Sequence, residues 1–425
     1  MADCLTSVSP MNIAYNIAIY LYYIGVWIAS FFSQKVSLMR KGEKDALGYL
    51  KQNLDGNARY LWFHAASLGE FEQGRPMMES IRKAHPEYKI LLTFFSPSGY
   101  EVRKNYNGAD LICYLPLDTP CNAHRFVSMV KPEMAFFIKY EFWYNYLHIL
   151  KHRGIPTYSI SSIFRDGQVF FRWYGKDYSK SLRCFTHLYV QNAKSQQLLA
   201  SIGIHNTTIV GDTRFDRVLQ IRDDAKQLPI IKSFIGNGEK KVFIAGSSWP
   251  GDETIFIPYF NKRHDTKMII APHVVTEEHL SQIITACEGE VVRYTQATEM
   301  NEQQLASADV LIIDCYGLLS SIYNYADITL VGGGFDHTGV HNVLEAAVWD
   351  KPVVYGPNYE EYREAIALVK AGGGLIANDA TSFATILDRL LSDEDYKNDA
   401  AAKAGAYVMS QQGTTKKILT DLGLN

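Results

Sequence analysis

Cysteine is scarce in this sequence, and its six copies are scattered without a CxxC pair. Repeats and low-complexity tracts are also missing. Neither sign of charge dominates, because 42 Lys and Arg stand against 45 Asp and Glu. The scattered cysteines argue against a disulfide framework or a zinc-ligand pair and favour a reduced, cytosolic compartment. The balanced charge argues against a chain that binds nucleic acid through its overall charge.

The beginning of the chain lacks charge, since no charged residue lies between Asp3 and Lys35. Residues 13–32 read IAYNIAIYLYYIGVWIASFF, and a helix of that length would extend about 30 Å, the thickness of a bilayer core. Its tyrosines and its tryptophan suit a membrane interface better than the membrane centre. No basic start or small-residue cleavage site marks it as a cleaved signal.

Four basic residues follow this segment, namely Lys35, Arg40, Lys41 and Lys44. Under the positive-inside rule they would place the rest of the chain in the cytoplasm. We therefore expect residues 1–34 to form a membrane anchor, a helix that either spans the bilayer or lies in its interface. The alternative is a hydrophobic helix that packs on the protein's own surface.

Short apolar runs alternate with helical patterns through the rest of the chain, which is too long for one ordinary core. Such runs are typical of parallel strands buried on both faces. We expect an α/β protein with two Rossmann-like, doubly wound domains that face a cleft, at residues 35–215 and 216–425. The polar stretch 211–229 holds their boundary. The runs are YLWFHA, KILLTFF, LICYLPL, EMAFFI, PTYSIS, HLYVQ and NTTIVG, then KVFIAGS, KMIIAPH, EVVRY, DVLIID, DITLVGG, KPVVYG and GGLIAN.

Two loops follow strands at the edges where open α/β sheets bind ligands. ASLGE ends in Glu70 and follows the first strand of the first domain, and GGGFDHTGVHNVLEAA follows DITLV in the second. The pair suggests an enzyme with two substrates. Glu70 stands at a helix start, where the macrodipole alone would favour a carboxylate, so catalysis is one of two interpretations.

The glycine run at residues 332–334 follows a strand and precedes a helix, an arrangement that can cradle a phosphate. The dinucleotide pattern GxGxxG fails because His337 replaces its last glycine. The P-loop pattern fails because Val340 stands where its lysine is required. These failures argue against a nicotinamide enzyme and an NTPase, and they leave a phosphate cradle or a plain tight turn.

Further polar residues have two interpretations each. Asn342 and Glu345 lie on one face of a first helical turn, where they could bind sugar hydroxyls and a phosphate or simply cap the helix. Ser247 and Ser248 in AGSSWPGDE could hold a phosphate or supply an N-cap. Glu141, among aromatics in FFIKYEFWYNYL, is either functional or a surface residue of an amphipathic helix.

His337 and His341 have the spacing of a metal-ligand pair. The sequence has no HExxH motif and no third ligand near them, so we expect no metal site here.

Seven segments, in this order, resemble those of the Kdo transferases, which add 3-deoxy-D-manno-oct-2-ulosonic acid (Kdo) to the lipid A precursor. The resemblance runs from the N-terminal hydrophobic segment to about Ala377. YEFWYN is similar to the family's E-L-W-P-N, and the last segment to its V-G-G-S…G-G-H-N-x-L-E-P-A…G-P. The segments are LWFHAASLGEFEQGRPMMESIR, TFFSPSGYE, YLPLDTP, YEFWYN, GDTRFD, GSSWPGDE and VGGGFDHTGVHNVLEAAVWDKPVVYGP.

The resemblance implies the two-domain glycosyltransferase B fold, CMP-Kdo as the donor and no catalytic metal or other cofactor. It implies that Glu70 is the base for a hydroxyl of the acceptor, lipid IVA, in an inverting step of lipopolysaccharide biosynthesis, and that Glu141 and Arg214 share the site. The enzyme would work at the cytoplasmic face of the bacterial inner membrane. The residues implied to line the donor site are Ser247, Ser248, Pro272, His273, Gly317, Gly333, Gly334, Asn342 and Glu345.

The sequence departs from the family pattern in four places. His273 replaces the arginine of P-R-H-P-E-R, and leucine follows Gly317 where the family has glutamate. Lys139 replaces the first acid of E-T-E, and Asp212 replaces the asparagine of G-N-x-K. These changes leave open a same-fold glycosyltransferase with another nucleotide sugar, or a non-catalytic, membrane-tethered sugar-nucleotide binder. An epimerase is a weaker alternative, against which the hydrophobic segment argues.

Overall fold

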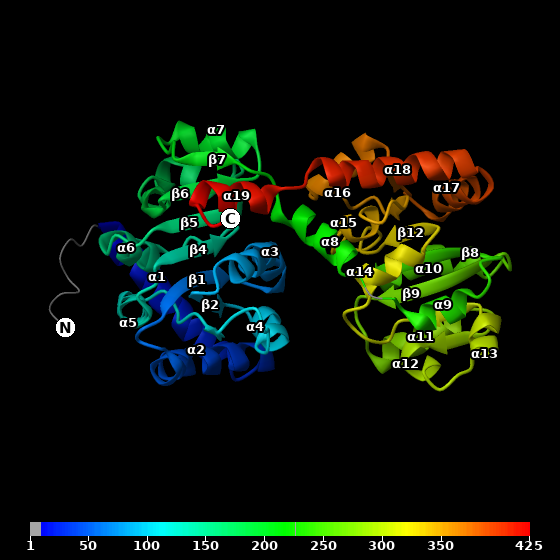
Figure 1. Cartoon of the computed structure of the whole chain (residues 1–425), viewed down its shortest axis with the longest axis horizontal. Coiled ribbons are helices and arrows are strands. Elements are labelled where there is room, and N and C mark those ends of the chain that lie inside the picture. Colours follow the sequence, from blue (N-terminus) through cyan, green and yellow to red (C-terminus); the bar gives the residue numbers. More distant parts are fainter. Residues whose placement is uncertain (1–9, 226) are drawn as a thin grey trace. The chain divides into compact units, whose positions relative to one another are not determined.

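The computed structural model describes residues 10–225 and 227–425 (Figure 1). The chain forms two compact units, each with its own sheet. The first unit runs to Arg217 and also contains Gly413–Asn425, and the second is Val218–Gln412. The division falls inside helix α8 (Thr213–Asp223), within the polar stretch expected to hold the boundary.

The expected assignment of the last residues to the second domain is wrong. Helix α19 (Thr414–Leu422) packs on the first unit, where Ile418 and Leu419 join the hydrophobic core. The hydroxyl of Tyr189 donates to Asp421 at 2.6 Å. Burial of this short amphipathic helix therefore completes the first unit with residues from the far end of the chain.

Seven parallel strands form the first sheet in the order β3-β2-β1-β4-β5-β6-β7. Successive side chains of a strand point to opposite faces, and here they feed two core clusters. Trp62 and Phe137 lie in one cluster, and Phe63 and Phe136 lie in the other. The strands are β1 (Arg59–Ala65), β2 (Tyr88–Phe94), β3 (Leu111–Tyr114), β4 (Met134–Ile138), β5 (Thr157–Ser162), β6 (His187–Val190) and β7 (Thr207–Ile209).

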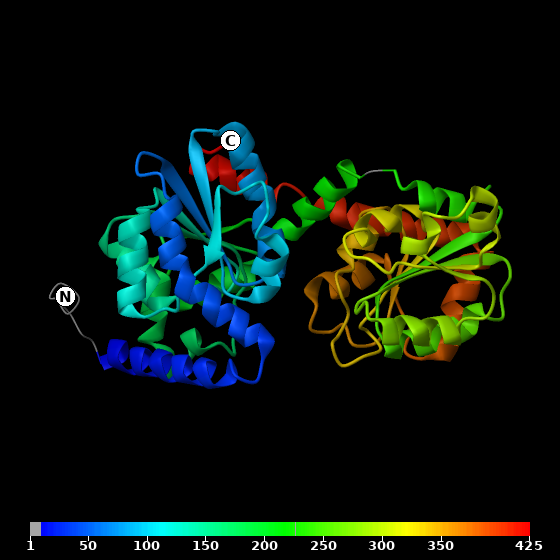
Figure 2. The same cartoon turned by 90° about the horizontal axis from the view of Figure 1, so that it is seen from below.

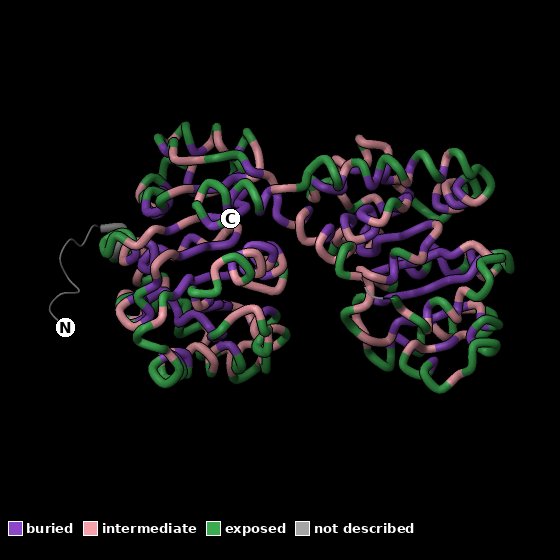
Figure 3. Tube along the Cα trace, in the orientation of Figure 1, coloured by how far each residue is buried: buried purple, intermediate pink, exposed green. Residues whose placement is uncertain are grey.

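Helices cover both faces of this sheet, which is why its central strands are almost entirely buried, whereas the edge strand β7 is mostly exposed (Figure 3). Local signals fix the helix ends: Thr119 caps α5 with its hydroxyl, and Arg82 and Lys83 lie in the last turn of α3, where the dipole favours cations. The helices of the first unit that precede α8 are α1 (Pro10–Ala29), α2 (Gln34–Asn53), α3 (Leu68–Ala84), α4 (Pro97–Arg103), α5 (Pro120–Val130), α6 (Tyr144–His152) and α7 (Ala193–Ser201).

The second unit repeats this plan with the strand order β10-β11-β9-β8-β12-β13-β14, again all parallel. Every apolar run quoted from the sequence is a strand in one of the two sheets. The strands are β8 (Lys241–Ser248), β9 (Thr266–Pro272), β10 (Val291–Arg293), β11 (Val310–Ile312), β12 (Ile328–Val331), β13 (Val353–Tyr355) and β14 (Gly374–Ile376).

The helices of the second unit are shorter on average around the β12 and β13 loops and longer near its C-terminal end. They are α9 (Pro229–Ile235), α10 (Pro250–Phe260), α11 (Glu277–Ala286), α12 (Tyr294–Ala297), α13 (Glu302–Ser307), α14 (Leu319–Ile322), α15 (Leu344–Ala347), α16 (Arg363–Ala371), α17 (Ala380–Ser392) and α18 (Glu394–Ser410).

Each sheet has one point at which the strand order reverses. In the first sheet this point lies between β1 and β4, and in the second it lies between β8 and β12. Ligands of open α/β sheets bind beyond the carboxyl ends of the strands at such a point. The loops after these four strands are therefore the places to look for a site.

Helix α1 lies along the outside of the first unit (Figure 2). One stripe of it is fixed to that unit, since the hydroxyl of Tyr15 donates to Asp118 at 2.7 Å and the amide of Asn145 donates to Asn16 at 2.9 Å. Most of its other apolar side chains are exposed, as Leu21 is at 63%. The helix is therefore docked on the protein while an apolar surface stays uncovered.

The expectation of a membrane-spanning anchor finds no support in this arrangement. Among residues 10–225 and 227–425, no helix combines the length and the apolarity needed to cross a bilayer. The alternative interpretation, a hydrophobic helix packed on the protein's own surface, describes the contacts of α1. Residues 1–9 of the expected anchor lie outside the described part of the chain.

Candidate active site

Glu70 stands in the first turn of α3, at the carboxyl end of the central strand β1. Ser67 begins this helix and is spaced from Glu70 as in a capping box, but its side chain caps no backbone N–H. The Ser67 hydroxyl instead donates to Oε2 of Glu70. The carboxylate is thus oriented by one hydroxyl, and its side chain remains 18% exposed.

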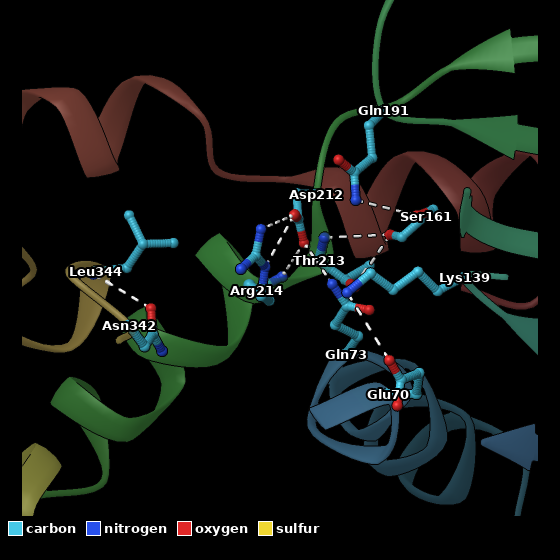
Figure 4. Close-up of polar contacts among 10 residues, drawn as sticks. All are labelled: Glu70, Gln73, Lys139, Ser161, Gln191, Asp212, Thr213, Arg214, Asn342 and Leu344. Atoms are coloured by element: carbon cyan, nitrogen blue, oxygen red, sulfur yellow. Dashed lines mark hydrogen bonds and ion pairs between the residues drawn. The ribbon is translucent and has the colours of Figure 1, made fainter. Parts of the chain in front are cut away.

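Lys139 is the nearest charged partner of Glu70, with Nζ 3.8 Å from Oε1 (Figure 4). It is the first residue after β4, so the two side chains come from the strands on either side of the reversal point. This separation is too long for a hydrogen bond but keeps a positive charge beside the carboxylate. The sequence identified Lys139 only as a departure from a family acid.

Glu141 is held by two donors of its own unit. Trp143 Nε1 donates to its Oε2 at 2.6 Å, and Nε2 of the buried His64 lies 3.2 Å from the same oxygen. Because Nε2 faces a carboxylate, that nitrogen carries the hydrogen, and Nδ1 accepts from Thr93 at 2.9 Å. Glu141 is therefore the end of a polar chain that reaches into the core.

Arg214 is paired within its own loop. Its Nε and one terminal nitrogen lie 2.9 and 2.8 Å from Oδ2 of Asp212, which is 8% exposed as a side chain. The amide nitrogen of the buried Gln73 donates to Oδ1 of Asp212 at 3.3 Å. The expected phosphate-binding cation is thus already half of an ion pair at the same sheet edge as Glu70 (Figure 4).

In the second unit, Ser247 and Ser248 end β8 differently. Ser247 has a left-handed backbone with φ of 54°, whereas Ser248 is buried and donates to Oε1 of Glu253 at 2.8 Å. Oε2 of Glu253 lies 2.9 Å from Nε2 of His279. The other ring nitrogen faces the Val274 carbonyl at 2.9 Å, so both ring nitrogens of His279 face acceptors.

The glycine loop after β12 is tied to Asp252 in the first turn of α10. The carboxylate is fully buried, and burial raises its pKa while its hydrogen bonds act in the opposite direction. It accepts from the backbone N–H groups of Trp249, Gly333 and Phe335, at 2.9, 2.7 and 3.2 Å. The N–H of Gly333 is therefore engaged inside the protein. At this glycine the loop is a tight turn, with φ of 89°, rather than an open phosphate cradle.

The close approach of two loops explains Gly334. A Cβ on it would lie 2.5 Å from the backbone nitrogen of Gly356, which follows β13. Only glycine fits where backbone meets backbone this closely.

Trp249, His273 and His341 form an aromatic stack that the sequence analysis missed. The rings of Trp249 and His273 are 4.9 Å apart at 22°, and those of His273 and His341 are 4.3 Å apart at 18°. Trp249 Nε1 donates to Nε2 of His341 at 2.8 Å, so His341 carries its hydrogen on Nδ1. Burial and then the charge of His273 lower the pKa of His341 to about 4. The stack brings together the ends of β8, β9 and β12, so no single segment could reveal it.

Asn342 and Glu345 do lie together, as their spacing predicted. The Asn342 amide donates to Oε1 of Glu345 at 3.0 Å. Its oxygen accepts from the Leu344 N–H at 3.2 Å (Figure 4). Oε2 of Glu345 accepts from Ser320, which comes shortly after Gly317. Gly317 has φ of 93° and open space around it. The two donor-site segments thus meet through Ser320. Pro272 is the last residue of β9, directly before His273.

Of the two histidines spaced as metal ligands, His341 uses Nε2 to accept from Trp249. Within the described residues no group of three or more His, Cys, Asp or Glu side chains is arranged to hold a metal ion.

The chain is similar in sequence to known sugar transferases. Residues 40–217 match the family model described as 3-deoxy-D-manno-octulosonic-acid transferase (kdotransferase). The transferase of that name from Aquifex aeolicus is 26% identical over 80% of this chain and 89% of its own, and that from Haemophilus influenzae is 23% identical over 84% and 85%. Residues 40–217 thus match the Kdo transferase family, and most of the chain is similar to curated transferases of that name. This similarity indicates a glycosyltransferase.

Solved structures show the fold alone. UDP-GlcNAc 2-epimerase from Neisseria meningitidis has a TM-score of 0.59 at 15% identity, over 86% of this chain and 100% of its own. MurG from Acinetobacter baumannii has a TM-score of 0.51 at 11% identity, over 85% and 98%. Two parallel α/β sheets of this kind agree with the expected glycosyltransferase B type.

Proposed function

We propose that this glycosyltransferase moves Kdo from CMP-Kdo to lipid IVA, with Glu70 as the general base. The relatives are named for transfer of this sugar. The observation that carries the proposal is the position and the contacts of the Glu70 carboxylate, at the carboxyl end of the central strand β1. One of its oxygens accepts from the Ser67 hydroxyl, and the other lies 3.8 Å from Nζ of Lys139. A base must have such an oxygen available for the proton that it removes.

The proposed step balances as one displacement. An acceptor hydroxyl attacks the anomeric carbon of Kdo, and Glu70 takes the hydroxyl proton as the new C–O bond forms. The bond between the anomeric carbon and the phosphate oxygen breaks, and CMP leaves with that electron pair. Attack from the face opposite to the phosphate inverts the anomeric configuration. The step needs no metal ion or other cofactor.

In this proposal Glu141 is a positioning group and Arg214 is the candidate cation for the phosphate of the leaving CMP. Glu141, held by His64 and Trp143, keeps the loop after β4 in place beside Glu70. Arg214 must exchange part of its pairing with Asp212 before it can bind the phosphate that gains charge as CMP leaves. Because Arg214 is already paired with Asp212, it is a weaker candidate for binding the phosphate than its charge alone suggested.

The second unit is proposed to bind the donor. The residues proposed to contact the donor lie at or just beyond the carboxyl edge of its sheet: Ser247, His273, Gly317, Gly334, Asn342 and Glu345. Ser248 and Gly333 instead bond within the protein, to Glu253 and Asp252. The stacked Trp249 and His273 offer aromatic surface where the family has an arginine. That difference favours, as a second candidate, a transferase of the same fold that uses another nucleotide sugar.

Helix α1 is proposed to rest in the interface of the cytoplasmic leaflet of the bacterial inner membrane. Its exposed apolar side chains, Trp27 included, suit that zone, and the basic residues that follow suit anionic lipid headgroups. Docking through Tyr15 would hold the first unit at the surface where an amphipathic acceptor resides. Vesicle sedimentation of a variant with Leu21 and Ile17 changed to Ser checks this placement.

The product identifies the function. Purified protein is mixed with tetra-acylated lipid A precursor and with CMP-Kdo generated in the same tube, and the lipid is analysed by mass spectrometry. A mass increase of one or more Kdo units is expected, and none without donor. Folded protein that adds no Kdo but adds sugar from another nucleotide sugar would contradict the proposed donor. Folded protein that adds no sugar at all would favour a non-catalytic binder.

A further inference from the structure

Lys139 follows β4 directly, at the reversal point of the first sheet. Ligands of open α/β sheets bind at this edge. Its ammonium group stands there beside Glu70, with Nζ 3.8 Å from Oε1. A cation beside the proposed base at a ligand-binding edge points to a contact with substrate.

The backbone of Lys139 is held in an uncommon conformation, with φ of 68°. Residues other than glycine adopt it at a cost, and such residues concentrate at functional sites. Two neighbours stabilise it here: the Lys139 N–H donates to the Ile160 carbonyl at 2.8 Å, and Ser162 donates to the Lys139 carbonyl at 2.9 Å. The side chain is thereby aimed at the first turn of α3 (Figure 4).

The ammonium group of Lys139 has unused hydrogen-bonding capacity. It carries three donors, and among the described residues no acceptor lies within hydrogen-bonding distance of Nζ. Its recorded contacts are Glu70 at 3.8 Å and the Tyr140 ring, whose centre is 5.4 Å away. The side chain is 25% exposed, so most of it is covered by the protein.

The carboxylates nearby are already engaged. Asp212 is paired with Arg214, and Glu141 accepts from Trp143 and lies beside His64. The N-terminus of the 17-residue helix α3 adds partial positive charge on the same side. An anion brought by a ligand would therefore meet a cation with open donors.

We propose that Lys139 binds an anionic group of a substrate, a phosphate or a carboxylate, next to the hydroxyl that Glu70 deprotonates. The inference rests on the proposed function and names a specificity contact within it. Either the phosphate of the acceptor's sugar headgroup or the carboxylate of the donor's sugar acid could supply the anion. The rival explanation is that Lys139 only balances the charge of Glu70.

Steady-state kinetics of Lys139→Met and Lys139→Arg test the proposal. Lys194→Met is the matched control, since Lys194 pairs with Asp166 on the surface of the same unit. We expect Lys139→Met to raise one Michaelis constant at least about tenfold, as loss of a charge-assisted hydrogen bond does, while Lys139→Arg restores most of the affinity. The control should leave both constants unchanged.

The affected substrate identifies the anion. A rise in the acceptor constant that disappears with a dephosphorylated acceptor assigns the contact to that phosphate, and a rise in the donor constant assigns it to the carboxylate. Unchanged constants, with only a shifted pH dependence of kcat, would overturn the proposal in favour of charge balance.

Failure of the wild type to make product would overturn the proposed function rather than this contact. In that case inorganic phosphate serves as the probe, by phosphorus NMR on wild type and Lys139→Met. Loss of phosphate binding in the variant supports the contact, and equal binding contradicts it.

Discussion

The two units place acidic residues at matching points, in the first turn of the helix after a central strand, yet they hold them differently. Glu70 follows β1, accepts from the Ser67 hydroxyl and has a more distant ammonium group beside it. Asp252 follows β8, is fully buried and accepts from three backbone N–H groups. Small residues followed by an acid therefore give the proposed base, a carboxylate with few partners, in one unit and a buried carboxylate with three backbone donors in the other.

The number of hydrogen bonds, rather than the helix dipole, separates the two roles. Both carboxylates share a favourable position at a helix start. Each hydrogen bond to the charged form makes a carboxylate less ready to take a proton. A base benefits from few such bonds, whereas a loop that must keep one shape benefits from many.

The largest effect on stability should follow from Asp252→Ala. Removing three hydrogen bonds to a charged group should lower the free energy of unfolding of the second unit by about 5 kcal/mol. Glu70→Ala should change that of the first unit by about 1 kcal/mol, since one hydroxyl donates to its carboxylate and the ammonium group beside it lies beyond hydrogen-bonding distance. Hydrogen exchange of β8 and β1 amides, read by mass spectrometry, reports each unit separately. Equal losses of unfolding free energy in the two variants would contradict the difference proposed between Asp252 and Glu70.

The first unit should lose stability as pH rises, through Glu43 on α2. Burial raises the pKa of this carboxyl to about 8, and its Oε1 has no partner in the described part of the chain. A raised pKa means that the folded state favours the neutral form of Glu43. The stabilising contribution of this carboxyl is therefore fully present below pH ~4.5 and is lost as the pH rises through 8. Glu43→Gln should remove a decline on the order of 3 kcal/mol in urea titrations at pH 5 and pH 9. A decline that persists in the variant would assign it to other groups.

The second unit should respond in the opposite direction, through His341. Its pKa is lowered to about 4, so the unfolded chain binds a proton before the folded unit does. Stability present above pH ~6.5 is then lost as pH falls through 4, by on the order of 2 kcal/mol. In the His341→Gln variant the second unit should lose less stability as the pH falls, as measured by hydrogen exchange of the β12 amides. An unchanged loss of stability at low pH would mean that burial of the His341 ring is not its cause.

The strands and the position of Glu70 could be predicted from the sequence because both are local signals. Parallel strands buried on both faces read as unbroken apolar runs, and an acid after a strand marks a ligand edge. The segment pattern also identified the family. Asn342 and Glu345 were predicted to lie together because three residues of helix bring side chains to one face.

The rest depends on contacts between distant segments. The ring of His273 stacks on those of Trp249 and His341 only once three strands are assembled, and α19 joins the first unit from the end of the chain. No local pattern shows that Asp252 would occupy the N–H of Gly333. Helix α1 was predicted from its apolarity, but its docking through Tyr15 needs Asp118, which lies far along the chain.

The rate of Kdo transfer by Glu70→Gln, at saturating donor and acceptor, tests the central claim most directly. Glutamine keeps the shape and can still accept from Ser67, but it cannot take the proton. The account predicts that kcat falls by about a thousandfold, the usual size of general-base catalysis, while hydrogen exchange of β1 stays as in the wild type. A folded variant that retains more than about a tenth of the wild-type rate would contradict the assignment of Glu70 as the base.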